Sequence, residues 1–295
     1  DSASAILASL IFSCYPFFVF YSITGLTETV YMFLLLLSFL CFYNEKSVLG
    51  SCVFVLSILV RPSLELLGPV LVFVFSRFVS QLDLRKCFRN VLVYGAIYFL
   101  MMSPWWIHNY HMYGHFVRLN LGDGIVLYSG NNPLNTTGGG VIRPDGSRDM
   151  DLRKFASIED PYERNKAMKK EATTFIQENP YHFLKMCFVK LSRFWRLVPF
   201  APEYKGKFYH IVSLASYGPV LLFSIIFVFL NGRRYLRQIS PVIMLIIFLS
   251  AVHAVTIGSI RYRLPLEPFL LMIASYQMVQ FYRSLFFSKA LKERC

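Results

Sequence analysis

Long apolar runs alternate with short polar segments along the chain, and this alternation is the first guide to its fold. Eight runs come close to the length, about 20 residues, with which an α-helix crosses a bilayer. These predicted spans are Ala3–Tyr21, Thr27–Tyr43, Val48–Val60, Leu64–Ser76, Val91–Ile107, Phe208–Leu230, Pro241–Gly258 and Leu264–Tyr282. The pattern predicts an all-α integral membrane protein, a polytopic helical bundle.

The third and fourth runs are shorter than a full span. The sequence leaves open whether they form one broken, re-entrant pair around Arg61-Pro62-Ser63 or two tilted helices. Composition supports a membrane protein, because hydrophobic residues make up 55% of the 295 residues and charged residues only 16%. A soluble domain would need more charge to cover its surface.

The basic residues set the predicted orientation. The net charge is +13, but the lysines and arginines flank apolar runs as membrane orientation requires, and no basic-aromatic motif indicates nucleic acid as a partner. Three short clusters should be cytoplasmic: Arg77, Arg85, Lys86 and Arg89; Arg233, Arg234 and Arg237; Arg283, Lys289, Lys292 and Arg294. The chain then divides into about five spans in residues 1–109, an extracytoplasmic segment in residues 110–207, and three spans with a basic cytoplasmic tail in residues 208–295.

The extracytoplasmic segment has two halves. The first is rich in Gly, Asn and Pro, from Asn120 to the Pro144-Asp145-Gly146 turn, and predicts irregular loop. Its glycines lack the Gly-Lys-Ser/Thr of a phosphate-binding loop. The second half predicts a helix that Asp160 caps and that ends near Glu178. A second helix, from Pro180 to about Arg196, mixes basic and aromatic residues, which suits either the lipid interface or a packed helix with a solvated basic face.

Other polar motifs in the sequence carry less information. Asn135-Thr136-Thr137 is a glycosylation sequon that matters only in a eukaryotic lumen. His253 lies inside a predicted span and is expected to be a core histidine. The six cysteines form no CxxC pair and no metal-ligand spacing, and we expect small buried hydrophobes.

A few charged residues fall together at the predicted outer boundary. Glu28 opens the second span there, and Arg61, Arg261 and Arg263 lie at the same level. A carboxylate at this depth is costly unless it faces a polar cavity or a partner. The alternatives are a helix N-terminal carboxylate for Glu28 and interfacial snorkelling for the arginines.

Several motifs in order along the chain support one resemblance. They are Tyr15-Pro16, Leu26-Thr27-Glu28, Leu59-Val60-Arg61-Pro62-Ser63, Ser103-Pro104-Trp105-Trp106-Ile107-His108-Asn109-Tyr110, Tyr128-Ser129-Gly130-Asn131-Asn132-Pro133 and Arg261-Tyr262-Arg263-Leu264-Pro265-Leu266-Glu267-Pro268. Together they resemble the polyprenyl-phosphate-sugar-dependent glycosyltransferases of the GT-C superfamily, specifically the family-39-like enzymes related to protein O-mannosyltransferases and lipid A aminoarabinose transferase.

The resemblance implies inverting transfer of a sugar from a polyprenyl-phosphate donor to a lipid, glycan or protein acceptor on the extracytoplasmic face. It makes Glu28 the catalytic candidate in this chain and Arg61, His108, Arg261 and Arg263 the substrate-binding candidates. Tryptophans of an interfacial belt are an alternative explanation of the polar residues around His108 and His111. The family's principal carboxylate lies in a first outer loop that we do not find, so we expect a longer parent protein and an inactive fragment.

Localisation, cofactors and alternative functions complete the expectations. The bacterial inner membrane is favoured over the membrane of the endoplasmic reticulum. No cofactor is certain, and a divalent metal stays open. The alternative function is a secondary transporter or flippase, which would show midplane charges and internal repeats that this sequence lacks. A membrane scaffold without chemistry would not need Glu28 and several arginines on one face.

Overall fold

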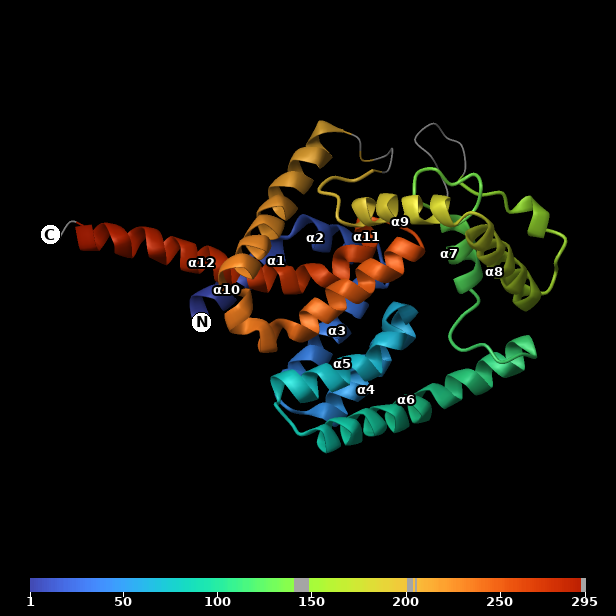
Figure 1. Cartoon of the computed structure of the whole chain (residues 1–295), viewed down its shortest axis with the longest axis horizontal. Coiled ribbons are helices and arrows are strands. Elements are labelled where there is room, and N and C mark those ends of the chain that lie inside the picture. The colour runs from blue at the N-terminus through green and yellow to red at the C-terminus, as the bar shows by residue number, and fades with distance from the viewer. Residues whose placement is uncertain (141–148, 201–203, 205, 293–295) are drawn as a thin grey trace.

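The protein is described here by a computed structural model that covers residues 1–140, 149–200, 204 and 206–292 (Figure 1). Within these residues it is 80% helix and contains no strand. The predicted turn at Pro144-Asp145-Gly146, together with Arg294 and Cys295, lies outside them. The all-helical fold class is therefore confirmed for the described part of the chain.

Helices follow one another with short connections. The first group is α1 (Ser2–Cys14), α2 (Pro16–Ile23), α3 (Glu28–Tyr43), α4 (Ser47–Val60), η1 (Pro62–Leu67), α5 (Gly68–Val74), η2 (Phe75–Val79) and α6 (Leu84–Tyr113). The second group is α7 (Asp123–Gly130), η3 (Arg153–Phe155), α8 (Pro161–Glu178), α9 (Pro180–Phe194), α10 (Lys207–Val255), α11 (Ile260–Arg263), η5 (Leu264–Leu266) and α12 (Glu267–Lys292).

Among the described residues, fewer helices could cross a membrane than the eight predicted runs. By length and composition, the stretch Pro62–Val79, α6 and α10 qualify, and α1 with α2 makes a fourth if this pair, bent by 47°, is one span. Helices α3 and α4 are apolar but only 16 and 14 residues long. The break at Arg61 thus separates a short helix from a helical stretch of span length.

Helix α10 differs from the prediction of two spans joined by a basic loop. All its 49 residues are helical, including Arg233, Arg234 and Arg237, yet Figure 1 shows it folding back on itself. Pro241 explains a bend, because its ring clashes with the carbonyl of residue 237 and offers no N–H. Two hydroxyl groups donate hydrogen bonds to backbone carbonyls beside this bend. Ser240 Oγ donates to Arg237 O (2.8 Å), and the Tyr43 hydroxyl donates to Gln238 O (2.6 Å).

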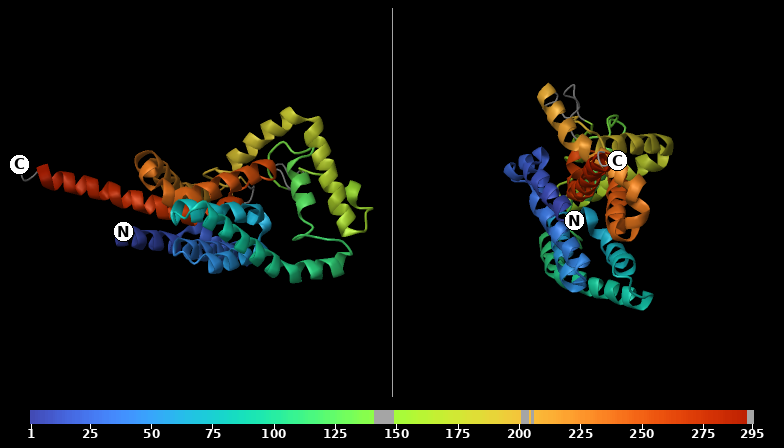
Figure 2. Two further views of the ribbon diagram at one scale, coloured as in Figure 1. Left: turned by 60° about the horizontal axis from the view of Figure 1, so that its bottom comes forward. Right: turned by 90° about the vertical axis from the view of Figure 1, so that its left-hand side faces the viewer.

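The main core lies between α3, α4, the 62–79 stretch, α10 and α12. A second cluster joins α1 and α2 to α10 and α12. The 110–207 segment, with α7, α8 and α9, lies at one end of this bundle (Figure 1 and Figure 2). It has a small core of its own, made by Tyr128, Met150, Phe155, Met168 and Ala172.

Predictions for the 110–207 segment were only partly right. Asp160 accepts a hydrogen bond from Tyr162 N (2.9 Å) and begins α8, as predicted. The prediction of irregular loop was wrong for residues 123–130, which form α7. Asn135 of the sequon is buried, and its side chain bonds the backbone of Ser129, Gly138 and Gly139, so in this fold it offers no accessible glycosylation site.

Candidate functional site

One carboxylate forms ion pairs with two of the predicted arginines. Glu28 is fully buried, and its Oε1 accepts a hydrogen bond from Arg61 Nη1 at 2.6 Å and another from Arg261 Nε. The arginine side chains are 18% and 37% exposed, so they lie between the buried carboxylate and the surface. Three sites far apart in sequence thus form one ion cluster, which we call the Glu28 cluster.

Each member of the Glu28 cluster stands at the end of a helix. Glu28 is the first residue of α3, Arg61 follows the last residue of α4, and Arg261 lies in the short α11. Pro62 keeps the preceding residue out of helical geometry, and Arg61 is extended at φ −146°. Ser259 caps α11 by accepting from Arg261 N. The cluster forms because helix ends meet at one level of the bundle.

Aromatic rings surround the Arg61 guanidinium. Its carbon lies 6.0 Å from the Tyr31 ring centroid and 5.7 Å from that of Tyr262, within cation–π range. The other neighbour of Tyr262 is His253, whose ring stacks on it at 4.5 Å. His253 is buried, with Nδ1 3.2 Å from Ile257 O, as expected of a core histidine. These contacts restrict the directions in which Arg61 can point.

Arg263, only two residues from Arg261, belongs to a different and closed ion pair. Its Nε donates to Glu267 Oε1 at 2.8 Å, and both side chains are completely buried. The guanidinium carbon lies 3.5 Å from the Tyr217 ring centroid, and Nη1 donates to Arg196 O at 2.7 Å. Of the two predicted candidates, Arg261 therefore joins the Glu28 cluster and Arg263 fastens α11 to α12 and α9.

A cavity of about 130 Å³ adjoins Arg261. Ser259 and Ile260 line it, together with Tyr21, Arg193 and Arg196. Within the described residues, neither Arg193 nor Arg196 forms an ion pair. Burial lowers the pKa of Arg193, Asp149 opposes this shift, and the positive charge of Arg196 adds to it. The cavity thus has two arginines on its wall and a third at the next residue along α11.

Helix α9 turns two of its basic residues, Lys190 and Arg193, inward, while Lys185 is exposed. Lys190 is fully buried, donating to Asn131 Oδ1 (2.8 Å) and Val255 O (3.0 Å), and burial lowers its pKa to about 8. Arg193 donates to Gly258 O at 3.1 Å and Thr137 O at 3.2 Å. The alternative of a packed helix with a solvated basic face therefore does not hold for these two residues. Large apolar side chains are exposed instead: Tyr181, Leu184 and Phe188.

Glycines allow the close approach of backbone around Lys190. A Cβ on Gly130 would lie 1.8 Å from Thr256 O, and one on Gly258 would lie 2.2 Å from Lys190 O. Gly258 N also donates to Gly138 O at 3.0 Å. The glycine-rich loop, α9 and the end of α10 therefore meet by backbone contact, next to the cavity and the Glu28 cluster.

His108 is not brought to the Glu28 cluster. It is exposed on α6, with its ring centroid 5.6 Å from that of Trp105 in a tilted arrangement that fits the interfacial alternative. Sequence reasoning missed Glu65 of η1, which is 8% exposed, accepts from Tyr98 and pairs with Arg118 at 3.0 Å. Its signal was available, because a carboxylate between Leu64 and Leu66 in an apolar run requires a partner.

The described part of the chain holds no group of three or more His, Cys, Asp or Glu side chains placed to bind a metal ion. Cys14, Cys41, Cys52, Cys87 and Cys187 are free thiols, and Cys14 is exposed, contrary to the expectation of burial. No protein-family model, curated protein or solved structure matches the chain.

Proposed function

We propose that the chain is part of a membrane glycosyltransferase that moves a sugar from a polyprenyl-phosphate donor to a lipid, glycan or protein acceptor. The resemblance to GT-C enzymes motivates the reaction class, with a GT-C-like bundle in the bacterial inner membrane and the 110–207 segment on the extracytoplasmic side. The observation that carries the proposal is the Glu28 cluster beside a cavity with two further arginines.

The charge of this region favours an anionic ligand. One carboxylate serves two arginines in the Glu28 cluster, and Arg193 and Arg196 add positive charge that no described ion pair neutralises. Guanidinium groups offer paired N–H donors that match phosphate oxygens. In glycosyl transfer the donor phosphate gains negative charge as the sugar departs, so cations here stabilise the transition state more than the bound donor.

Glu28 takes a positioning role in this proposal. Its side chain has no exposed surface, and one oxygen already accepts from both arginines, so it is poorly placed to take a proton from an acceptor. A buried carboxylate instead fixes Arg61 and Arg261 in one geometry before the donor arrives. Such preorganised donors need no rearrangement in the transition state.

The lipid nature of the donor is supported by where the region lies. Arg61 immediately precedes the apolar 62–79 stretch, which is long and apolar enough to cross a membrane. Helix α9, which carries Arg193, exposes Tyr181, Leu184 and Phe188. A phosphate held beside these elements would leave its prenyl chain close to apolar surface.

Sugar transfer from a radiolabelled polyprenyl-phosphate donor, by the full-length protein in reconstituted membranes, tests the proposal. We expect Arg61→Ala to lower turnover about 10²–10³-fold, the effect of removing one preorganised donor. Arg61→Lys should recover only part of the lost turnover, because the point charge of lysine replaces the two-pronged guanidinium donor.

The matched control is Arg283→Ala, which removes an arginine that pairs with Asp1 on the surface and should leave turnover unchanged. Full activity in Arg61→Ala would exclude Arg61 from the site. If the intact protein moved the lipid-linked donor across the membrane without transferring sugar, the transporter alternative would replace the proposal.

A further inference from the structure

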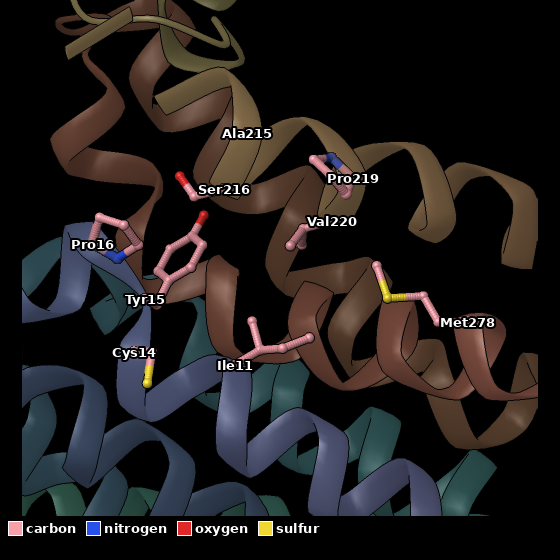
Figure 3. A pocket seen from close by; sticks show the side chains of 9 residues that line it. All are labelled: Ile11, Cys14, Tyr15, Pro16, Ala215, Ser216, Pro219, Val220 and Met278. Atoms are coloured by element: carbon pink, nitrogen blue, oxygen red, sulfur yellow. The ribbon is translucent and has the colours of Figure 1, made fainter. Parts of the chain in front are cut away.

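A second cavity lies away from the arginines, between the α1–α2 bend and α10. Its volume is about 330 Å³, within the size range of small-molecule sites. Figure 3 shows Ile11, Tyr15 and Pro16 on one side, Ser216 and Val220 on the other, and Met278 of α12 farther along. It shares no lining residue with the cavity beside Arg261.

One break in helix geometry adjoins this cavity. Helices α1 and α2 meet at Tyr15 with a bend of 47°, and Pro16 begins α2. A proline lacks the N–H that would continue the hydrogen bonds of α1, which suits a new helix starting there. Across the cavity, Pro219 lies inside the continuous helix α10 and contributes to the lining.

The lining is mostly apolar. Ser216 Oγ already donates to Ser213 O at 3.2 Å, and the Tyr15 hydroxyl lies next to the buried Glu267 carboxylate. The remaining lining side chains, from Ile11 to Met278, offer no strong polar group. A buried water needs two to four polar partners, whereas apolar cavities take up apolar guests. The lining therefore favours an apolar guest.

The cavity opens towards apolar surroundings. Cys14, Pro16, Ala215 and Pro219 line it and are also exposed at the surface. The helices that carry them, the α1–α2 pair and α10, are among those long and apolar enough to cross a membrane. An apolar guest that enters from the side of a membrane would be a lipid chain.

We propose that this cavity binds one acyl chain of a bilayer phospholipid, which enters between the α1–α2 bend and α10 and packs against Ile11, Val220 and Met278. The site is separate from the proposed donor region and does not depend on glycosyl transfer. The bound chain fills the space beside the α1–α2 bend, and so becomes part of the packing between α1 and α10.

The test uses the unaltered full chain in phosphatidylcholine vesicles that contain a phosphatidylcholine with a photoreactive group on one acyl chain. After irradiation, mass spectrometry of peptides locates the label. We expect labelling of residues 11–16 and 215–220 that saturates as the probe fraction rises. Labelling of the exposed α6 residues Phe99 and Leu100 should instead rise in proportion to that fraction, because they contact lipid without a site.

A variant that fills the cavity provides a second test. Ser216→Phe places a ring in the cavity and should lower the saturable label by about tenfold, the effect of excluding two methylene groups from burial. The control is Leu214→Phe, because Leu214 is 51% exposed on the same helix and does not line the cavity. The Leu214→Phe variant should keep the saturable label.

Three results would overturn the assignment. The first is label at residues 11–16 and 215–220 that never saturates, which the unaltered protein decides even if Ser216→Phe does not fold. The second is an undiminished label in a folded Ser216→Phe. The third is displacement of the label by a long-chain prenol at concentrations at which added phosphatidylcholine has no effect, which would make the occupant a prenyl chain.

Discussion

Arg261 and Arg263 stand two residues apart on the same short helix, and each pairs with a glutamate, yet their surroundings are opposite. Arg261 is 37% exposed and shares Glu28 with Arg61. Arg263 and Glu267 are fully buried, and their pair is enclosed by Tyr217 and by the backbone at and just after the end of α9. The open pair leaves arginine surface for a ligand, whereas the closed pair can only hold helices together. Proximity in sequence therefore says little about role, and exposure decides it.

The largest loss of stability should come from breaking the buried pair of Arg263 and Glu267. Arg263→Leu leaves Glu267 buried without its partner, and breaking a buried ion pair in this way costs about 3–5 kcal/mol of stability. Thermal unfolding of the purified protein, followed by circular dichroism, measures the loss. The double variant Arg263→Leu/Glu267→Leu should recover most of it, because no unpaired charge remains.

The same comparison predicts a smaller loss for Arg261→Leu. Glu28 keeps its bond to Arg61, and Arg261 is partly solvated, so about 1 kcal/mol is expected. If Arg261→Leu destabilised the protein as much as Arg263→Leu, the distinction between an open and a closed pair would be wrong.

Lys190, like Arg263, is a fully buried cation, and it sharpens the comparison because no carboxylate pairs with it among the described residues. Burial lowers its pKa from 10.5 to about 8, so between these values the unfolded chain binds more protons than the folded one. Stability should therefore rise with pH across this window, at most by about 1.4 kcal/mol per pH unit.

Thermal melting at several pH values between 7 and 10 checks the Lys190 prediction. Lys190→Met should flatten the rise, whereas Lys185→Met, at an exposed position of the same helix, should leave it unchanged. An equal rise in Lys190→Met would assign the pH dependence to other groups.

The last variant, Glu28→Gln, is read by kinetics; it keeps an oxygen for the arginines and removes one charge. We expect kcat for sugar transfer to fall roughly tenfold while KM does not rise, because the released positive charge still binds phosphate but the arginines are less well fixed. Steady-state kinetics of the full-length protein separate the two constants. A higher KM at unchanged kcat would mean that Glu28 serves ground-state binding only.

The sequence indicated which residues form the Glu28 cluster, but it did not indicate the contacts of the residues around the cluster. Glu28, Arg61 and Arg261 could be brought together because each lies at the end of an apolar run, where span boundaries define a common level. The bond of Lys190 to Asn131 depends on tertiary packing across 59 residues, which no local pattern encodes. The closed pair was partly accessible, since Arg263 and Glu267 are four residues apart, but burial had to be known.

Element boundaries failed where a polar residue was taken as the end of an apolar helix. The arginines at 233, 234 and 237 indicated a loop, yet α10 stays helical through them and bends near its middle. The turn residues before Asp123 indicated a loop that the structure replaces with α7. In both places tertiary contacts outweigh local propensity, as they often do for short or exposed segments.

The Lys190 site also bears on how the protein is assembled during synthesis. Its two acceptors are Asn131, made before Lys190, and the carbonyl of Val255 at the end of α10, made 65 residues after it. The ribosome must therefore finish α10, and the end of α10 must reach the level of α9, before the buried amine has both partners. A chain whose α10 inserted without folding back could not supply Val255 and would keep an unsatisfied lysine. Docking of the 110–207 segment would then serve as a late check on correct insertion.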